Sequence, residues 1–368
     1  MKENSLKILR KLIENGYQAY IVGGFVRDYI LKRESYDVDI CTDATPKEIK
    51  EVFNDASVPK FEYGSIYLKS QNIDYEITTF RKEIKYEHNR KPVEVEYIKD
   101  LKEDLSRRDF TINTICMDVK GNIIDLLDGV SDLKKGLIKT IKDPNLVVQE
   151  DSLRILRAVR FATVLNFRID DDLKKAIINH KELLRNLSYE RKKDELTKIL
   201  ASEYKGYGIS LIKELGLKED LEIDNLDKAL LTKDILGMWI AIDINNKYMV
   251  TKSEKSIKEH IYDMIDKGIN SYTMYKYGSY VTSIVAEITG LDRQEYLNKY
   301  ELLPIKNIKD INITSEEICK ALNMKNKDLL KHIYPDLEES ILSDKLINDK
   351  NEIIEYIKNK YQGAVYEE

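Results

Sequence analysis

The segments Tyr20-Ile-Val-Gly-Gly-Phe-Val-Arg-Asp-Tyr29 and Tyr36-Asp-Val-Asp-Ile40 predict the fold of the first part of the chain. The apolar run that ends at Gly23-Gly24 predicts a strand, the glycine pair predicts a tight turn, and the residues after it predict a short helix. Backbone N–H groups at the start of such a helix can receive phosphate oxygens, and Arg27 follows one turn later. A glycine pair before a helix is more often an ordinary turn, so this segment alone is weak evidence for a phosphate site.

The second segment predicts a strand that carries two acidic side chains. Side chains alternate along a strand, so Asp37 and Asp39 point to the same face. Two adjacent carboxylates repel each other unless a cation lies between them, and Mg²⁺ prefers oxygen ligands. A solvated strand face is the commoner explanation for such a pair in isolation. The two segments together, joined by one helix, indicate a metal-dependent nucleotidyl transfer site in which Asp37 and Asp39 bind Mg²⁺.

The composition limits the class of protein. A chain of 368 residues, with 42% hydrophobic and 34% charged residues, is typical of a soluble globular protein with two or more compact units. The sequence contains no run of 18 apolar residues and no apolar leader, so we expect no membrane segment. Cys41, Cys116 and Cys319 follow no disulfide or metal spacing, which favours a cytoplasmic location. The net charge of −5 hides local arginine clusters and does not exclude RNA as a partner.

The pattern of predicted elements changes along the chain. Short β-like runs occupy residues 18–128, whereas helical patterns fill almost all of the chain beyond about residue 145. The expected fold class is therefore α+β, with a head followed by an all-helical remainder. The charged residues 82–92 predict a mobile loop, and Lys120-Gly-Asn122 predicts a hairpin turn. The runs predicted to be strands are Gln18–Val22, Val38–Cys41, Ser65–Lys69, Tyr75–Phe80, Val93–Ile98 and Ile112–Val119.

A third carboxylate would complete a metal-dependent catalytic site. Asp74 and Glu76 share one face of the same predicted strand, and either could be ordinary surface decoration. We favour Glu76 as the third catalytic carboxylate because it lies deeper in the apolar run.

The segment Arg107-Arg108-Asp109-Phe-Thr-Ile-Asn113 has the residue types that bind a ribose and its phosphates. Arginine supplies bidentate donors to phosphate, while the Asp109 and Asn113 side chains can accept a hydrogen bond from a 2′-hydroxyl. A structural salt bridge with a capping asparagine would look the same in sequence. We expect Arg108, Asp109 and Asn113 to bind the nucleotide.

Residues 150–161 predict a helix with an arginine-rich side. Asp151 and Arg154 lie one turn apart and can act as a pair. Cytosine and adenine each present an amino group beside a ring-nitrogen acceptor, so an Asp acceptor and an Arg donor would choose C and A over U and G. A surface ion pair is the alternative, although Arg157 and Arg160 on the same side make it less convincing.

A further charged segment, Glu190-Arg-Lys-Lys-Asp-Glu195, has pairs at helical spacing: Glu190 with Lys193, and Arg191 with Glu195. We interpret this segment as a helix that braces its neighbour.

Taken in order, these segments resemble the class II tRNA nucleotidyltransferases, the group of the bacterial CCA-adding enzymes and their poly(A) polymerase relatives. The resemblance is dense over residues 18–200 and weak over the C-terminal part. The matching motifs are Gly23-Gly24-x-x-Arg27-Asp28, Asp37-x-Asp39, Glu76-x-Thr-Thr-Phe-Arg81, Arg107-Arg108-Asp109-x-x-x-Asn113, Glu150-Asp151-x-x-Arg154 and Glu190-Arg191-x-x-x-Glu195.

The resemblance implies a seahorse-like arrangement of a nucleotidyltransferase head with a small mixed β-sheet, followed by an all-α neck, body and tail. We place these parts at residues 1–138, 139–200, 201–290 and 291–368. It also implies a flexible loop over residues 81–97 that helps switch nucleotide choice from C to A, and that is shortened in members that add only CC. The loop here is full length, which favours complete CCA addition.

The resemblance further implies a role for each motif. Asp37 and Asp39 would hold two Mg²⁺, and Gly23, Gly24 and Arg27 would contact the triphosphate. Ribose recognition would fall to Arg108, Asp109 and Asn113. The incoming base would be selected by Asp151 and Arg154, with Arg157 and Arg160 near the nucleotide.

The resulting hypothesis is a CCA-adding enzyme that uses CTP and ATP to complete the 3′ end of tRNA without a nucleic-acid template. A partial enzyme that adds only CC or only A would share these motifs. A poly(A) polymerase would share them as well. A non-catalytic RNA-binding module is a further alternative, but it would have no use for the acidic pair.

Overall fold

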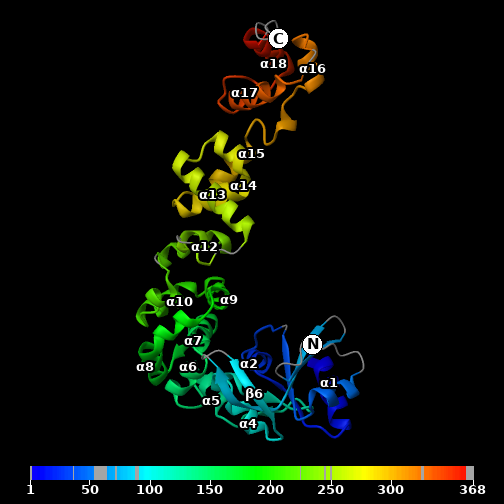
Figure 1. Ribbon diagram of the computed structural model, residues 1–368, viewed down its shortest axis with the longest axis vertical. Helices are drawn as coiled ribbons and strands as arrows, with labels where there is room; N and C mark the ends of the chain where they lie inside the picture. Colours follow the sequence, from blue (N-terminus) through cyan, green and yellow to red (C-terminus); the bar gives the residue numbers. More distant parts are fainter. Residues whose placement is uncertain are drawn as a thin grey trace. The chain divides into compact units, whose positions relative to one another are not determined.

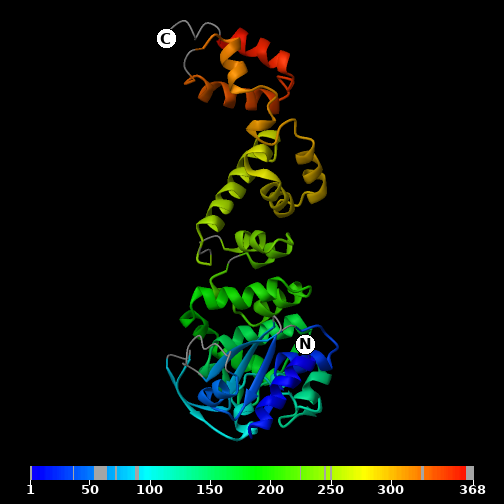
Figure 2. The same ribbon diagram turned by 90° about the vertical axis from the view of Figure 1, so that its right-hand side faces the viewer.

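The computed structural model describes residues 2–35, 37–53, 64–70, 73–87, 91–223, 225–243, 246–248, 251–324 and 327–361. The chain forms two compact units, Met1–Asp224 and Asn225–Glu368 (Figure 1). The first unit contains the β-sheet and the helices that follow it, and the second unit is helical (Figure 2). The finer division into four parts at residues 138, 200 and 290 stays a prediction.

A six-stranded mixed sheet forms the centre of the head, which confirms the predicted α+β class. Strand β2 pairs in parallel with β4, and all the other neighbours in the sheet are antiparallel. The strand order is β3-β4-β2-β1-β7-β8. The strands are β1 (Ala19–Val22), β2 (Val38–Thr42), β3 (Ser65–Ser70), β4 (Ile73–Thr79), β7 (Cys116–Met117) and β8 (Ile123–Ile124).

Short helices join and cover these strands. Helix α1 (Lys2–Glu14) packs against β1 and β2 through its buried apolar side. Helix α2 (Gly24–Ile30) connects β1 to β2, as the glycine pair predicted. Helix α3 (Pro46–Val52) begins at a capping box in which the Thr45 and Glu48 side chains each accept a hydrogen bond from the other's backbone N–H. Helix α4 (Leu101–Ser106) precedes the Arg-Arg-Asp segment.

The prediction of a mobile loop at residues 82–92 is wrong for the described part of that segment. Strands β5 (Arg81–Glu87) and β6 (Lys91–Tyr97) form a separate antiparallel pair, while residues 88–90 lie outside the described residues. The register places Lys82 opposite Glu96. The Lys82 side chain forms its ion pair with Glu103 of α4, at 3.1 Å, and not with Glu96. The predicted strand Val93–Ile98 corresponds to most of β6, so the error lies in β5 and in the first residues of β6.

The prediction of one long strand over Ile112–Val119 is also wrong. A 3-10 helix, η2 (Thr111–Asn113), occupies its start, and only Cys116 and Met117 form a strand. The Thr114 hydroxyl donates to the Thr111 carbonyl at 2.7 Å, which competes with strand pairing. The predicted hairpin after it is confirmed, with β7 antiparallel to β8 around a Gly121 that has positive φ.

Helices fill most of the described chain beyond about residue 145, as predicted, and helix α5 begins earlier, at Gly129. Beyond Gly129, the only strands among the described residues are β9 (Leu137–Ile138) and β10 (Arg168–Ile169), which pair in parallel. None of the described helices is long and apolar enough to cross a membrane. In the first unit the helices are α5 (Gly129–Lys135), α6 (Pro144–Glu150), α7 (Leu153–Leu165), α8 (Asp171–His180), η3 (Lys181–Asn186), α9 (Tyr189–Leu200), α10 (Lys205–Glu214) and α11 (Lys218–Leu221).

The second unit has its own buried core, part of which is an isoleucine- and leucine-rich cluster from Ile305 to Ile357. Its helices are η4 (Leu226–Leu230), α12 (Ile235–Ile242), α13 (Lys252–Lys267), α14 (Ser271–Ile288), α15 (Arg293–Glu301), η5 (Ile308–Asp310), α16 (Ser315–Ala321), α17 (Leu330–Leu342) and α18 (Lys350–Tyr361).

Candidate active site

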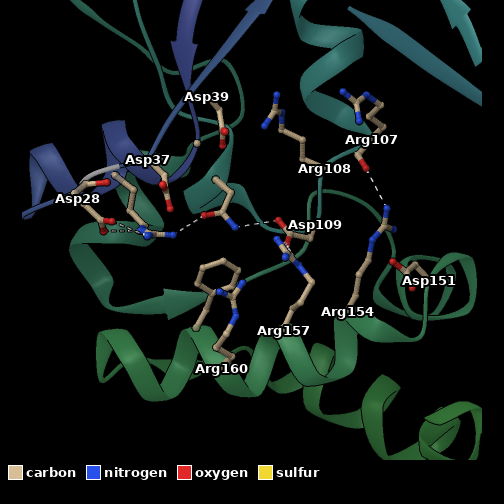
Figure 3. A pocket seen from close by; sticks show the side chains of 16 residues that line it. Asp28, Asp37, Asp39, Arg107, Arg108, Asp109, Asp151, Arg154, Arg157 and Arg160 are labelled. Carbon is tan, nitrogen blue, oxygen red and sulfur yellow. Dashed lines mark hydrogen bonds and ion pairs between the residues drawn. The ribbon is translucent and has the colours of Figure 1, made fainter. Parts of the chain in front are cut away.

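One cavity of about 430 Å³ in the first unit brings together all but one of the predicted site residues (Figure 3). The exception is Glu76. Asp37 and Asp39 lie at one end of the view and Asp151 at the other, with arginines between them. The residues that line the cavity are Gly23, Gly24, Arg27, Asp28, Ser35, Asp37, Asp39, Arg107, Arg108, Asp109, Asn113, Asp151, Arg154, Arg157, Arg160 and Phe161.

The turn between β1 and α2 requires a glycine at its first position. Gly23 has φ 79° and ψ −132°, a conformation that costs any other residue free energy. A Cβ atom built there would lie 3.7 Å from Asp39 Oδ2 and 3.8 Å from Arg108 Nη1. The turn therefore brings the backbone of the glycine pair beside both the acidic residue and the arginine.

Asp39 of β2 and Asp37, the residue before that strand, form the acidic end of the cavity. Both are exposed, and Figure 3 shows their carboxylates pointing into it. The pKa of Asp39 lies above its ordinary value because the surrounding protein removes water from the carboxylate and because Glu76 and Asp37 repel its charge; Arg108 opposes these effects. A carboxylate pair with unfavourable mutual repulsion is a site that a divalent cation would stabilise.

Glu76 lies beside this pair but outside the main cavity. It is the direct partner of Asp39 across the parallel pair of β2 and β4, and it lines a smaller cavity of about 170 Å³ that Asp39 also lines. Within the described part of the chain, no group of three or more acidic, histidine or cysteine side chains is close enough to hold a metal. Mg²⁺ commonly binds through one or two carboxylates together with substrate phosphates, so Asp37 and Asp39 fit this ion.

A chain of hydrogen bonds links the glycine turn to the Arg-Arg-Asp segment (Figure 3). Arg27 makes a bidentate pair with Asp28, with both distances 2.9 Å, and its Nη1 donates to Asn113 Oδ1 at 2.9 Å. The Asn113 amide donates to Asp109 Oδ1 at 3.0 Å. Arg157 Nε donates to the other oxygen, Asp109 Oδ2, at 2.7 Å. Three predicted nucleotide-binding segments are thus fixed to one another.

Arg107 and Arg108 are held in place by Asp104, which could not be recognised as part of the site from the motif alone. The buried carboxylate of Asp104 accepts from Arg107 Nη2 at 2.7 Å and from Arg108 Nη2 at 3.5 Å. Burial alone would raise the pKa of Asp104, but the two guanidinium groups hold it below its ordinary value. Asp104 precedes the two arginines by three and four residues at the end of α4, and this helical spacing is a signal that could have identified the carboxylate.

Asp151 and Arg154 line the same end of the cavity, but their ion pairs are to other residues. Arg154 Nη1 donates to Glu150 at 2.9 Å, and its Nη2 donates to the Arg107 carbonyl at 3.1 Å. Asp151 Oδ1 accepts from the Leu153 N–H at 3.1 Å and lies 3.5 Å from Arg191 Nη2. The pKa of Asp151 is raised because it is desolvated, although Arg191 and, to a lesser degree, Arg154 lower it. Both groups are thus oriented by neighbours on adjacent elements.

Helix α9 braces α7, as predicted, but through contacts between helices. Glu195 pairs with Arg160 of α7 at 2.7 Å, and Arg191 pairs with Asp151. The predicted pairing of Arg191 with Glu195 within the helix is therefore wrong. Spacing along one helix predicts local pairs, but these side chains face a neighbouring element that offers better-buried partners.

Family models match three parts of the chain. The poly(A) polymerase head domain matches residues 19–139, and the RNA- and SrmB-binding site of polymerase A matches residues 166–224. Domain 2 of the tRNA nucleotidyltransferases matches residues 248–357.

Curated relatives match nearly the whole chain. The CCA-adding enzyme of Bacillus licheniformis is 35% identical over 96% of this chain and 97% of its own length. The CCA-adding enzyme of Ligilactobacillus salivarius is 34% identical over 99% of this chain and 98% of its own length.

Solved structures share the fold. The crystal structure of the Bacillus stearothermophilus CCA-adding enzyme in complex with CTP superposes with a TM-score of 0.82, at 23% identity, over 99% of this chain and 98% of that one. The Thermotoga maritima CCA-adding enzyme complexed with tRNA-CCA gives a TM-score of 0.72, at 21% identity, over 97% of this chain and 94% of that one.

Proposed function

The chain belongs to the family of CCA-adding enzymes, and from this membership we propose that it adds C, C and A to the 3′ end of tRNA, using CTP and ATP and no nucleic-acid template. The observation that supports the proposal is a single cavity that joins an exposed aspartate pair to a cluster of arginines, with Asp151 at the far end. A nucleotide placed along it would have its phosphates near the aspartates and its base near Asp151.

We infer that the metal of this nucleotidyltransferase is Mg²⁺, held by Asp37 and Asp39. When bound there, two such ions would activate the tRNA 3′-hydroxyl and neutralise the departing pyrophosphate. Glu76, whose charge raises the pKa of Asp39, strengthens the acidic field at that end of the cavity. Retained turnover after removal of divalent ions would contradict this assignment.

The remaining cavity residues act on the nucleotide itself. Arg27, Arg157 and Arg160 supply the positive charge that a triphosphate requires. Asn113 and Asp109 present amide and carboxylate groups to a ribose, and Arg108 lies beside the glycine turn. Gly23 and Gly24 let the backbone approach the phosphates closely.

Two further features support the proposal: the segment 81–97 bears on complete CCA addition, and the cysteines bear on cellular location. Strands β5 and β6 form the full-length segment that we predicted to favour complete addition over a partial CC- or A-adding activity. Buried, unpaired Cys41 and Cys116, with half-buried Cys319, are consistent with a cytoplasmic location.

The deciding experiment sizes the products made on tRNA that lacks its 3′ end. We expect three added nucleotides with Mg²⁺, CTP and ATP together, and no product from Asp39→Ala, whose folding is checked by thermal melting. Growth that stops at two nucleotides, or A addition only to tRNA ending in CC, would indicate a partial enzyme. A long ladder from ATP alone would indicate a poly(A) polymerase, and RNA binding without turnover would indicate a non-catalytic module.

Nucleotide choice is tested by the double substitution Asp151→Ala and Arg154→Ala. Both side chains offer the acceptor and donor that complement cytosine and adenine, and each matched base contact contributes roughly 1–3 kcal/mol of discrimination. We expect kcat/KM for UTP and GTP to approach the values for CTP and ATP, within about tenfold. A double variant that still uses only CTP and ATP would remove the templating role from these residues.

A further inference from the structure

We propose that Phe161 is a positioning residue that holds the guanidinium groups of Arg27, Arg157 and Arg160 at the spacing that receives the triphosphate of the incoming nucleotide. This inference rests on the proposed function, because that function assigns phosphate binding to the three arginines.

The three guanidinium groups converge on one aromatic ring. The Cζ atoms of Arg160, Arg27 and Arg157 lie 4.2, 5.1 and 5.3 Å from the centroid of the Phe161 ring. A cation within about 6 Å of a ring centroid is attracted by the negative face of the ring. Phe161 is only 8% exposed, and an edge-on contact with Phe110, at 5.8 Å between centroids, fixes its orientation.

Each arginine also has a carboxylate partner, and each partner comes from a different part of the fold. Arg27 pairs with Asp28 of α2, Arg157 with Asp109 after α4, and Arg160 with Glu195 of α9. Each carboxylate neutralises one of the three arginines. Phe161 touches all three guanidinium groups, so the ring sets the distances between them.

Repulsion between the guanidinium groups persists at Arg160, and a bound anion would relieve it. The pKa of Arg160 is lowered by burial and by repulsion from Arg157 and Arg27, although Glu195 raises it. The three side chains are 9%, 32% and 16% exposed for Arg27, Arg157 and Arg160, so water screens this repulsion only in part. A polyphosphate carries several negative charges that can relieve this repulsion, whereas a base is uncharged and cannot. Losing the ring should therefore weaken CTP and ATP equally.

The test measures binding of inorganic tripolyphosphate to the full-length protein by calorimetry, in buffer without divalent ions. For Phe161→Leu we expect the Kd to rise about tenfold, because the cation–ring contacts are lost and the arginines spread apart. Phe161→Tyr keeps the ring and should stay within about twofold of the wild type.

Phe53→Leu is the matched control. Phe53 is 7% exposed and has Lys11 Nζ 4.8 Å from its ring centroid, but it does not line the cavity. It should lose stability as a buried phenylalanine does while keeping the wild-type Kd for tripolyphosphate. An equal loss of binding in both leucine variants would overturn the proposal, and so would an unchanged Kd in Phe161→Leu. If Phe161→Leu does not fold, Phe161→Met fills the volume without a ring and must show the same loss.

Steady-state kinetics separate a positioning role from a structural one. In Phe161→Leu the KM values for CTP and ATP should rise together by about tenfold, with kcat within about twofold and the C-to-A preference unchanged. Tripolyphosphate binding requires neither tRNA nor a base. A wild-type protein that binds tripolyphosphate but does not extend tRNA would refute the proposed function and leave the role of Phe161 intact. If the wild type extends tRNA normally and Phe161→Leu leaves the Kd for tripolyphosphate unchanged, the role of Phe161 is refuted and the proposed function stands.

Discussion

Asp109 is a carboxylate whose two oxygens are both engaged by the protein. Oδ1 accepts from the Phe110 N–H at 2.8 Å and from the Asn113 amide, while Oδ2 accepts from Arg157. Burial alone would raise the pKa of Asp109, but Arg157 and these hydrogen bonds lower it to about 2. In the proposed nucleotide site, the 2′-hydroxyl of a ribose would share this carboxylate with groups that already hold it in place.

The lowered pKa gives a stability prediction with a definite sign. The pKa of Asp109 in the folded protein lies below the ordinary value of 3.8, so the carboxylate stabilises the fold above about pH 4. This contribution, about 2 kcal/mol, is lost as the pH falls from about 4 toward about 2, because the unfolded chain takes up the proton first. Urea unfolding of the wild type and Asp109→Asn should therefore differ at pH 7 and converge only near pH 2.

Asp172→Asn serves as the control for that series. Asp172 forms an ion pair with Lys175 in which both side chains are about three-quarters exposed, so its loss should change the free energy of unfolding little at any pH. A difference between the wild type and Asp109→Asn that stays constant from pH 7 to pH 2 would show that the carboxylate charge is not what stabilises this part of the fold.

Helix α7 shows what the local sequence pattern can and cannot predict at the scale of an element. The stripe Ile155, Val159 and Ala162 is buried, as predicted from its spacing. The arginines on the other side are not a solvated face, because Glu150, Asp109 and Glu195 reach them from α6, the segment after α4, and α9. Spacing within one helix predicts which residues share a face, but it contains no information about which distant carboxylate meets that face.

The difference between a local pattern and contacts with distant residues also explains which strands were predicted correctly and which were not. Strands β1, β2 and β4 were predictable because apolar residues dominate them, whereas the register that places Glu76 opposite Asp39 depends on strand pairing, which the local pattern does not contain. The alternation of Val93–Ile98 predicted most of β6, but its partner β5 (Arg81–Glu87) is mostly charged, so apolar alternation could not identify β5. Phe161 was overlooked for a related reason, since a phenylalanine on a mostly buried helix is indistinguishable in sequence from ordinary core.

At the scale of the whole molecule, the proposed nucleotide-binding cavity lies in one compact unit, and a region that matches a tRNA nucleotidyltransferase domain lies in the other. Every residue of the main cavity lies within residues 1–224. The match to domain 2 of the tRNA nucleotidyltransferases, residues 248–357, lies entirely in the second unit. Residues 166–224, which match an RNA-binding site, belong to the first unit.

This separation predicts the behaviour of a chain that ends at residue 224. Such a fragment keeps the whole cavity, so it should bind inorganic tripolyphosphate with a Kd within about threefold of the full-length value. Its tRNA affinity should fall at least about tenfold, because a second binding surface joined to the first raises affinity by increasing the effective concentration. Calorimetry with tripolyphosphate and filter binding with tRNA measure the two effects, and circular dichroism verifies that the fragment is folded. A folded fragment with full tRNA affinity would place tRNA recognition in the first unit, whereas loss of tripolyphosphate binding would show that the cavity depends on the second.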